Sequence, residues 1–462
     1  MRIKNTLSPQ TDDVQADPKA GNDGSALLAT LCFAAVLSLS LSSYLAVCYR
    51  SLYLSNRDMQ VTRSIELAEM GIEEALWALS NGNWTGWSTA GSTATKTLLG
   101  PGNFENNVTN RIQLTITNYN LPTSSFTSTS TPAITMTAMG RVILPDGTTI
   151  SRTLQSLARP AQVFTNAIGA TGTLSFASGG FVDSYDSSAG SYSYSATLSA
   201  GNSAAVISGS TISLQNAQVF GFASTTSNVS TPFQNGSSGK VVGPGTAAGT
   251  NIDSTRVSTA GNQPVFDLVV PSGGTTIYDP NNGNAVISHS MAINTSGVYR
   301  LTAMDLGGPD TISINAANVV LVVSDYVKLG GNSKIQVASG ASLQLYVETN
   351  PSSSHRQLDI GGNGIINVSQ LPQNVSIVGL GTRTTSGLNS QITTDVAFYG
   401  SIYLPNDNID ISDNGFTAFG ALVGKNIGFS GTGPSIHFDK ALLRIAPSGV
   451  NTPFSLVWLH EV

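Results

Sequence analysis

The sequence is poor in charge and has almost no cysteine. Only 10% of its 462 residues are charged, and 27 acidic residues outnumber 21 lysines and arginines, which gives a formal net charge of −6. No basic stripe stands out, and affinity for nucleic acid comes largely from lysine and arginine contacts to phosphate. We therefore expect no nucleic-acid partner. Because charge is scarce, the polar surface must consist mostly of hydroxyl and amide groups, which suits long β surfaces outside the cytoplasm.

The two cysteines, Cys32 and Cys48, both lie inside one apolar run. On a single helix they would be about 24 Å apart along the axis, at a rise of about 1.5 Å per residue. A disulfide needs Cα atoms within about 7 Å of each other. The two cysteines therefore cannot bridge, and any folded β region must be stable without disulfides.

Motifs for metal, phosphate or cofactor binding are also missing. The four histidines have neither cysteine partners nor the H-x-x-x-H spacing of zinc ligands; they are His289, His355, His437 and His460. The glycines follow turn-like segments rather than a strand-to-helix junction, so no phosphate-binding loop is predicted. We expect no cofactor, no metal and no catalytic residue, and hence a protein that is not an enzyme.

Three weaker constellations have a chemical interpretation beside a structural one. Asp183 and Asp186 could act as general acid and base in sugar cleavage, but carboxylates three apart in a Ser- and Tyr-rich loop are more often solvated turn residues. His437 and Asp439 with nearby serines form no triad until geometry places them. An asparagine- and aspartate-rich stretch could line a calcium site, but it lacks the spacing of a calcium-binding loop, and turn capping is the favoured interpretation. Its residues are Asn406, Asp407, Asn408, Asp410, Asp413 and Asn414.

The strongest positive feature is an apolar run followed by an amphipathic segment. No charged side chain occurs from Ser25 to Tyr49, and those roughly 25 residues would span more than the ~30 Å hydrocarbon core of a bilayer as a helix. From Val61 to Leu79, apolar residues recur at helical spacing. The pattern predicts one helix over 25–80, membrane-embedded at its start and ended by the Asn81-Gly82 pair.

Beyond residue 81 the sequence predicts β structure. Apolar residues alternate from Arg111 to Leu157, and Pro145-Asp146-Gly147 predicts the turn of a hairpin, so we expect a small antiparallel sheet packed on the helix end. Trp77, Trp84 and Trp87 are expected to pack the helix end against it. From about 161 to 445, many short strands separated by Gly, Asn and Ser predict a parallel β-helix, with a β-sandwich as the alternative.

The first 80 residues resemble the N-terminal region of PilX-type minor pilins of type IV pili. The resemblance lies in Gly24-Ser25-Ala26-Leu27-Leu28, in the apolar run, and in the segment Leu67-Ala68-Glu69-Met70-Gly71-Ile72-Glu73-Glu74-Ala75-Leu76. It implies that prepilin peptidase cuts after Gly24 and that the mature chain begins at an N-methylated Ser25. Two features depart from the pattern: Ala29 stands where major pilins carry a glutamate, and the leader is acidic at Asp12, Asp13, Asp17 and Asp23.

A second resemblance covers roughly residues 165–445. Three segments are similar to β-helical C-terminal domains fused to PilX-like helices, and the resemblance implies no activity. These segments are Val182 to Ser188, Phe398 to Asn406, and Ile436 to Asp439.

Together these features predict a mainly β protein with one long N-terminal helix. The expected divisions are a leader peptide (1–24), a transmembrane and amphipathic helix (25–80), a small antiparallel subdomain (81–160), a β-helix-like domain (161–445) and a C-terminal segment (446–462). The resemblance implies a single-pass protein of a bacterial inner membrane with its head in the periplasm and later on a pilus or the cell surface. The implied partners are other pilins, prepilin peptidase, the inner-membrane assembly platform and membrane lipid. The alternatives are a membrane-anchored surface adhesin that is never processed, or a tethered polysaccharide-active enzyme.

Overall fold

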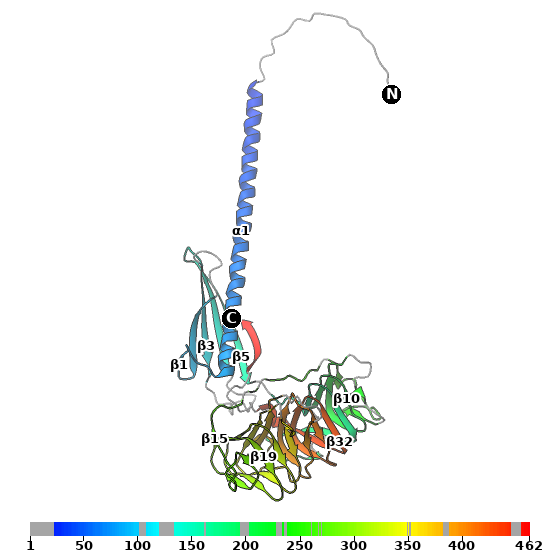
Figure 1. Cartoon of the computed structure of the whole chain (residues 1–462). Coiled ribbons are helices and arrows are strands. Elements are labelled where there is room, and N and C mark those ends of the chain that lie inside the picture. Colours follow the sequence, from blue (N-terminus) through cyan, green and yellow to red (C-terminus); the bar gives the residue numbers. More distant parts are fainter. Residues whose placement is uncertain are drawn as a thin grey trace, which may run out of the picture.

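The computed structural model describes residues 23–100, 108–119, 134–160, 163–194, 203–227, 233–234, 238–259, 261–266, 268, 270–348, 350, 353–381, 388–444 and 454–462. One long helix comes first and a mostly β body follows, as the sequence predicts (Figure 1). The expected leader lies almost wholly outside the described residues.

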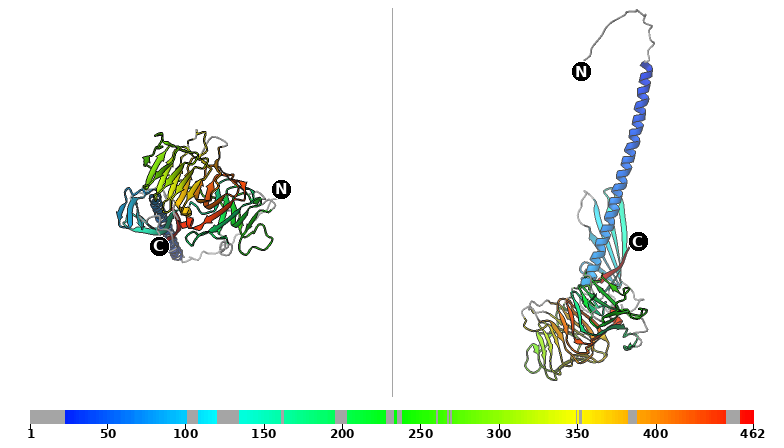
Figure 2. Two further views of the ribbon diagram at one scale, coloured as in Figure 1. Left: turned by 90° about the horizontal axis from the view of Figure 1, so that it is seen from below. Right: turned by 90° about the vertical axis from the view of Figure 1, so that its right-hand side faces the viewer.

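Helix α1 (Asp23–Asn81) has 59 residues and is therefore about 90 Å long. Its first half projects away from the rest of the chain, and its second half lies against a sheet (Figures 1 and 2). In the second half, Leu67, Ala68, Ile72 and Ala75 are buried. The helix ends where expected, since Gly82 takes a positive φ of 59° directly after it.

A six-stranded antiparallel sheet covers the second half of α1. Its strands, in spatial order, are β1 (Ser88–Ala90), β2 (Thr93–Leu99), β3 (Thr109–Thr117), β4 (Ile134–Ile143), β5 (Thr149–Pro160) and β34 (Phe454–Glu461). Strands β3 and β4 alternate buried and more exposed positions along their length, as the sequence predicts for a sheet with one covered face. The predicted hairpin is confirmed: β4 pairs with β5, and the Thr148 amide donates to Asp146 Oδ1 at 2.8 Å within the turn.

Two glycines allow the close approach between α1 and this sheet. A Cβ atom at Gly140 would lie 2.0 Å from the Ser64 carbonyl oxygen, and one at Gly71 would lie 2.5 Å from a methyl carbon of Leu114. Of the three tryptophans expected at the helix end, Trp87 is buried and Trp84 packs on Tyr119, with their ring centroids 4.6 Å apart. The expectation for Trp77 is wrong, because its side chain is 51% exposed on the outer face of α1.

The last strand of this sheet comes from the far end of the chain. Strand β34 pairs antiparallel with β5, and Ser156 Oγ donates to the Trp458 carbonyl at 2.6 Å. The amide of Phe454 donates to Ser80 Oγ at 3.1 Å, so β34 begins beside the end of α1. From the sequence, residues 446–462 were expected to form a C-terminal segment outside both β units. The periodicity of an isolated apolar run does not specify the strand with which it pairs.

Residues 163–444, here called the parallel region, form three sheets whose strand pairs are all parallel. One sheet has ten strands in the order β12-β10-β7-β32-β30-β28-β25-β22-β19-β16, and another has four in the order β17-β20-β23-β26. The third has 14 strands, ordered β15-β18-β21-β24-β27-β29-β31-β33-β8-β11-β9-β6 along its main path, with β13 and β14 also on β11. From β15 to β25, each strand pairs with the one three places later in the chain.

The bounds of the first strands of the parallel region are β6 (Ile168–Ala170), β7 (Leu174–Ser178), β8 (Phe181–Tyr185), β9 (Ala204–Ser208), β10 (Ile212–Ser213), β11 (Gln218–Thr225), β12 (Phe233–Gln234), β13 (Lys240–Val242), β14 (Val257–Ser258), β15 (Thr275–Thr276), β16 (Val286–Ile287), β17 (Met291–Ile293), β18 (Gly297–Leu301) and β19 (Ala303–Leu306). The later elements are β20 (Thr311–Ile314), β21 (Val319–Val323), β22 (Val327–Leu329), β23 (Lys334–Val337), β24 (Leu343–Val347), β25 (Leu358–Ile360), β26 (Ile365–Asn367), the 3-10 turn η2 (Pro372–Asn374), β27 (Val375–Gly379), β28 (Ser390–Ile392), β29 (Phe398–Leu404), β30 (Ile409–Ile411), β31 (Thr417–Gly424), β32 (Ile427–Thr432), β33 (Ser435–Asp439) and the 3-10 turn η3 (Lys440–Arg444).

The end of the parallel region pairs with its beginning. Strands β31, β32 and β33 pair with β6, β7 and β8, a line of contact that we call the junction. Phe176 and Phe429 stack across it with ring centroids 4.7 Å apart, inside a core made almost entirely of aliphatic and aromatic side chains. The chain therefore runs outward from the junction through β14, crosses to the far end, and returns to the junction through β15 to β33.

The crossing segment lies over the outer face of the 14-stranded sheet. Phe266 and Leu268 pack against an apolar row that includes Tyr346 and Tyr403. The Tyr403 hydroxyl accepts from the Phe266 amide at 2.6 Å and donates to the Phe266 carbonyl at 3.0 Å. This outer row is therefore covered by the chain itself.

Candidate functional site

The largest exposed apolar surface of the described residues is the first half of α1. Large apolar side chains from Leu27 to Leu54 are between 54% and 73% exposed. The helix contains a stretch that is long and apolar enough to cross a membrane, and none of that stretch is buried by the rest of the chain. Soluble proteins rarely expose apolar patches beyond a few hundred Å², so this surface marks a contact with lipid or with other protein. The first arginines after the uncharged run from Ser25 to Tyr49 are Arg50 and Arg57.

The expected cleavage site, Gly24 and Ser25, lies in the first turn of α1. Ser25 is exposed, and the peptide bond between the two residues is at the projecting end of the helix (Figure 1). Cleavage there remains a prediction.

A buried polar cluster lies at the junction and brings together two residues that the sequence analysis placed in different pairs. His437 on β33 is the register partner of Asp183 on β8, with 2.6 Å between His437 Nδ1 and Asp183 Oδ1. The Tyr192 hydroxyl donates to Asp183 Oδ2 at 2.7 Å. Asp183 is fully buried and His437 is only 6% exposed. Burial and the hydrogen bond to Asp183 raise the pKa of the Tyr192 hydroxyl.

Aromatic rings continue this cluster across three strands of the 14-stranded sheet. Tyr399 on β29 stacks on Phe419 on β31, with ring centroids 4.4 Å apart, and Phe419 lies 4.7 Å from the His437 ring. The Tyr192 ring lies 4.0 Å from His437 and 5.5 Å from Phe419, so the three rings contact one another. The imidazole thus packs against two aromatic rings and is almost completely buried.

Asp186 and Asp439 make turn and backbone contacts instead of the catalytic pairings that were considered as the less favoured interpretation. The Asp186 carboxylate accepts from Ser188, whose hydroxyl donates at 2.5 Å, as a solvated turn residue does. Asp439 is buried and accepts from the Ser187 and Ala441 amides, at 2.9 and 3.0 Å. The Asp183 carboxylate instead contacts His437 and Tyr192. The geometry joins Asp183 to His437 and leaves Asp186 and Asp439 with backbone-capping roles.

The asparagine- and aspartate-rich stretch ties neighbouring turns together. Asp407 accepts from the Asn408 amide at 2.9 Å and from Ser390 Oγ at 2.5 Å. Side-chain amides then link Asn389, Asn408 and Asn426 in a ladder that reaches Thr173 across the junction. These contacts confirm the turn-capping interpretation of Asp407 and Asn408. Among the residues that the structure describes, no group of three or more His, Cys, Asp or Glu side chains is placed to hold a metal ion.

Two further acidic residues line a small cleft on the surface of the parallel region. Asp395 and Asp413 face a space of about 190 Å³ between two turns, with Thr394 and Asn414 beside them. Asn414 is engaged elsewhere, since its side-chain oxygen accepts from the Thr432 amide and hydroxyl, both at 2.9 Å. The cleft has no positively charged or nucleophilic lining side chain beyond threonine hydroxyls.

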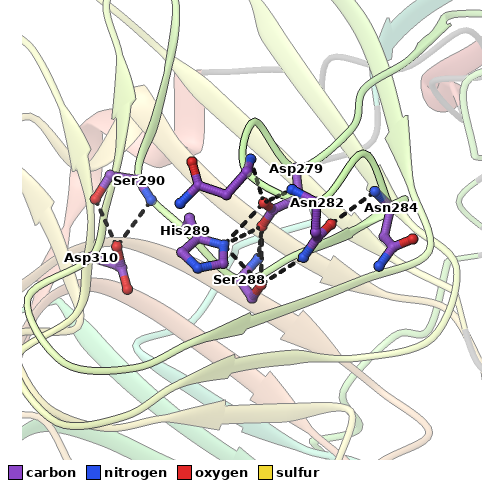
Figure 3. Close-up of polar contacts among 8 residues, drawn as sticks. Asp279, Asn282, Asn284, Ser288, His289, Ser290 and Asp310 are labelled. Atoms are coloured by element: carbon purple, nitrogen blue, oxygen red, sulfur yellow. Dashed lines mark hydrogen bonds and ion pairs between the residues drawn. The ribbon is translucent and has the colours of Figure 1, made fainter.

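A further buried carboxylate, Asp279, was not among the residues expected from the sequence. Asp279 accepts from the Ser288 amide at 2.6 Å, from Ser288 Oγ at 3.0 Å and from the Asn281 amide at 2.9 Å, and His289 Nδ1 lies 3.0 Å away (Figure 3). Burial alone would raise the pKa of Asp279, but the hydrogen bonds from Ser288, Asn281 and His289 outweigh it and lower the pKa. The signal in the sequence is the turn-forming run that begins at Asp279-Pro280.

This network fixes the turn before β16 and β17, at the end of the parallel region farthest from the junction. The neighbouring link has the same character, because Asp310 accepts from the Ser290 amide and hydroxyl at 3.0 and 2.9 Å (Figure 3). Both arrangements satisfy backbone amides at strand ends. Their geometry is that of structural caps.

The chain matches one family model and also matches solved structures. Residues 250–445 match the model of a family described as a domain of unknown function, DUF7305. The matched range includes β15 to β33, the strands that lead back to the junction. Among solved structures, the chain is matched to the competence-associated pilin ComZ from Thermus thermophilus, at 10% identity, over 87% of this chain and 97% of that chain, with a TM-score of 0.18. At that TM-score the match carries no argument about this chain. No curated protein matches the sequence.

Proposed function

We propose that this chain is a membrane-anchored, pilin-like structural subunit of a type IV pilus or a related filament. The observation that carries the proposal is the division of α1 into two halves. The first half exposes an apolar surface long enough to cross a membrane, and the second half is fixed to a folded sheet by the close contacts at Gly71 and Gly140.

Such a helix suits two successive environments. Before assembly, lipid covers the apolar side chains from Leu27 to Leu54. In a filament, the helices of other subunits would cover the same side chains and exclude water. Fully burying one leucine or phenylalanine contributes about 1.5–3 kcal/mol, so either environment is far more favourable than water. The partners in this proposal are membrane lipid, other pilins, prepilin peptidase and the inner-membrane assembly platform.

We further propose that the parallel region is a parallel β-helix and acts as a displayed, adhesive head. Support comes from the three sheets, in which successive strands enter successive sheets and then repeat. It is displayed because it lies at the end of the molecule opposite the apolar half of α1 (Figures 1 and 2). In this arrangement the head lies in the periplasm until the subunit is assembled.

We assign the head a non-enzymatic role. Its most enzyme-like group, Asp183 with His437, is buried among aromatic rings. The tethered polysaccharide-active enzyme therefore has no open acid and base pair among the candidates that the sequence offered.

A membrane-anchored adhesin that is never processed is the second candidate. The acidic leader residues Asp12, Asp13 and Asp17, and Ala29 in place of a glutamate, favour it. It shares the anchor and the head with the first proposal but predicts that residues 1–24 stay attached.

The test is the mass and N-terminal sequence of the protein isolated from membranes of cells with and without a prepilin peptidase. A chain that starts at a methylated Ser25 only when the peptidase is present supports the pilin-like function. An intact Met1 end in both strains would overturn it in favour of the unprocessed adhesin.

A further inference from the structure

Strand β34 is an unprotected edge strand of the antiparallel sheet. It is the last strand in the order β1-β2-β3-β4-β5-β34, and its outer hydrogen-bonding edge meets no other strand among the described residues. Edge strands are normally protected by lysine, proline or a covering element, because their free amide and carbonyl groups can pair with another chain. Phe454–Glu461 contains no lysine, arginine or proline.

The side chains of β34 are mostly apolar, and several of them are partly exposed to solvent. Leu456, Val457, Trp458 and Leu459 are between 38% and 47% exposed. The only acidic group, Glu461, is paired at the strand end with Arg152, at 3.0 Å.

We propose that β34 of one copy pairs with β1 of the next copy, which points its anchor the same way, so that the sheet continues from subunit to subunit. This inference rests on the proposed function, since neighbours anchored in one membrane or one filament must have their helices pointing in the same direction.

Strand direction selects β1 as the partner. All five neighbouring pairs in this six-stranded sheet are antiparallel, so the two edge strands run in opposite directions. Two copies in the same orientation therefore present β34 and β1 to each other antiparallel, the geometry that extends the sheet. Pairing β34 with the β34 of a second copy in antiparallel fashion would instead require a two-fold axis across the strands, and the two anchors would point in opposite directions.

The chemistry and size of β1 fit a weak contact that repeats. Ser88, Thr89 and Ala90 are all exposed and uncharged, so nothing on this edge repels an apolar strand. Only three residues are available on β1, and such a short strand pairing is weak between free molecules. Subunits that already share a membrane or a filament have a high effective concentration, so a weak pairing is sufficient to hold neighbours together. A contact between two different surfaces of the same chain also propagates rather than closing as a dimer.

Disulfide cross-linking of the full chain in membranes tests this contact. In a Cys32→Ser, Cys48→Ser background, Thr89→Cys is combined in turn with Leu456→Cys, Val457→Cys and Trp458→Cys to cover the possible registers. We expect at least one combination to give a ladder of dimers and larger species under oxidation, and every single-cysteine variant to give none. The matched collision control is Thr89→Cys with Tyr278→Cys, because Tyr278 is exposed but lies in the parallel region.

A dimer formed by Val457→Cys alone would overturn the proposal, because it would mean that two β34 strands meet. Absence of the ladder in all three registers, in a chain that starts at Ser25, would overturn it and leave the pilin-like function standing. A ladder from a chain that keeps Met1 in both strains would support the contact and overturn the pilin-like function. As a second measurement, Val457→Lys added to the pair of Thr89→Cys with Leu456→Cys or Trp458→Cys should abolish most of the ladder, whereas Val457→Thr in the same pair should retain it; equal ladders from both would count against pairing at this edge.

Discussion

Asp183 and His437 are 254 residues apart in the chain, yet only 2.6 Å separates Asp183 Oδ1 from His437 Nδ1. Each lies at one side of the junction, where the end of the parallel region returns to its beginning. A polar contact at this point, packed against Tyr192 and Phe419, has a single favourable register, because a slip of one residue would leave a buried carboxylate without its partner. The pair therefore specifies how the two ends of the parallel region align.

The first prediction concerns this pair. Asp183→Ala removes the acceptor of both His437 and Tyr192 and should destabilise the parallel region by about 3 kcal/mol, the cost of breaking a buried pair by removing one partner. Asp186→Ala is the control and should change stability by less than about 0.5 kcal/mol. The measurement is denaturant unfolding of the detergent-solubilised chain by far-UV circular dichroism. Equal midpoints for the two variants would show that the junction does not depend on Asp183.

The four tryptophans allow the two folded parts to be followed separately. Trp77, Trp84, Trp87 and Trp458 all lie on α1, beside it, or on β34, so the described parallel region contains none. In Asp183→Ala the tryptophan fluorescence transition should stay close to that of the parent chain while the circular dichroism transition moves. A matching shift in both signals would indicate that the two parts unfold as one unit.

The second prediction is a pH dependence at Asp279. Its pKa is lowered in the folded protein, so its contribution to stability is present above the ordinary aspartate pKa of about 3.9 and is lost as pH falls from there toward the folded value. Asp279→Asn should lower the unfolding midpoint at pH 7, by about 2 kcal/mol in stability, and flatten the pH dependence below pH ~4. Asp413→Asn, in the surface cleft, is the control. An unchanged slope in Asp279→Asn would contradict this assignment.

The third prediction tests the close packing of α1 against the antiparallel sheet. Gly140→Ala places a methyl group where the Ser64 carbonyl lies 2.0 Å away, so helix and sheet must separate. We expect a loss of about 1–3 kcal/mol or more, measured by tryptophan fluorescence. Gly307→Ala is the matched control, because a Cβ atom there would meet nothing within 4 Å. If both variants behaved alike, close contact at Gly140 would not be what fixes the helix.

Local patterns predicted the elements whose partners are near in sequence. The α1 periodicity at Ile72 and Ala75, and the turn at Asp146-Gly147, each involve residues within one or two turns of the chain. The helix, its end and the β4–β5 hairpin follow from them. The succession of short strands from Val319 onward likewise indicated strand type and frequency, because each strand pairs with one only two or three places away in the chain.

Long-range pairings were not predictable in the same way. Nothing near Asp183 specifies that its partner is His437 rather than Asp186, since the junction depends on how many strands run outward before the chain returns. Strand β34 is a second case, because its apolar residues could have paired with any free edge. Trp77 is a third: helical spacing placed it at the helix end but not on the covered face. In each case the missing information is the position of a distant segment.

The last prediction concerns membrane insertion. Leu37 lies near the middle of the uncharged run from Ser25 to Tyr49 and is 54% exposed, whereas Leu52 lies beyond it, close to Arg50 and Arg57, and is 71% exposed. An arginine at the centre of a spanning helix costs about 2.5–3.5 kcal/mol in insertion scales, and far less near its end, where the side chain can reach the interface. Leu37→Arg should therefore move much of the protein from the membrane pellet to the soluble or degraded fraction after carbonate extraction, and Leu52→Arg should not. Both variants leave the folded β body untouched, because neither leucine contacts it, so tryptophan fluorescence of the detergent-solubilised proteins should be the same. Equal retention of both variants in the pellet would mean that the run does not cross the bilayer at this depth, and the helix would then have to be anchored by contact with other protein.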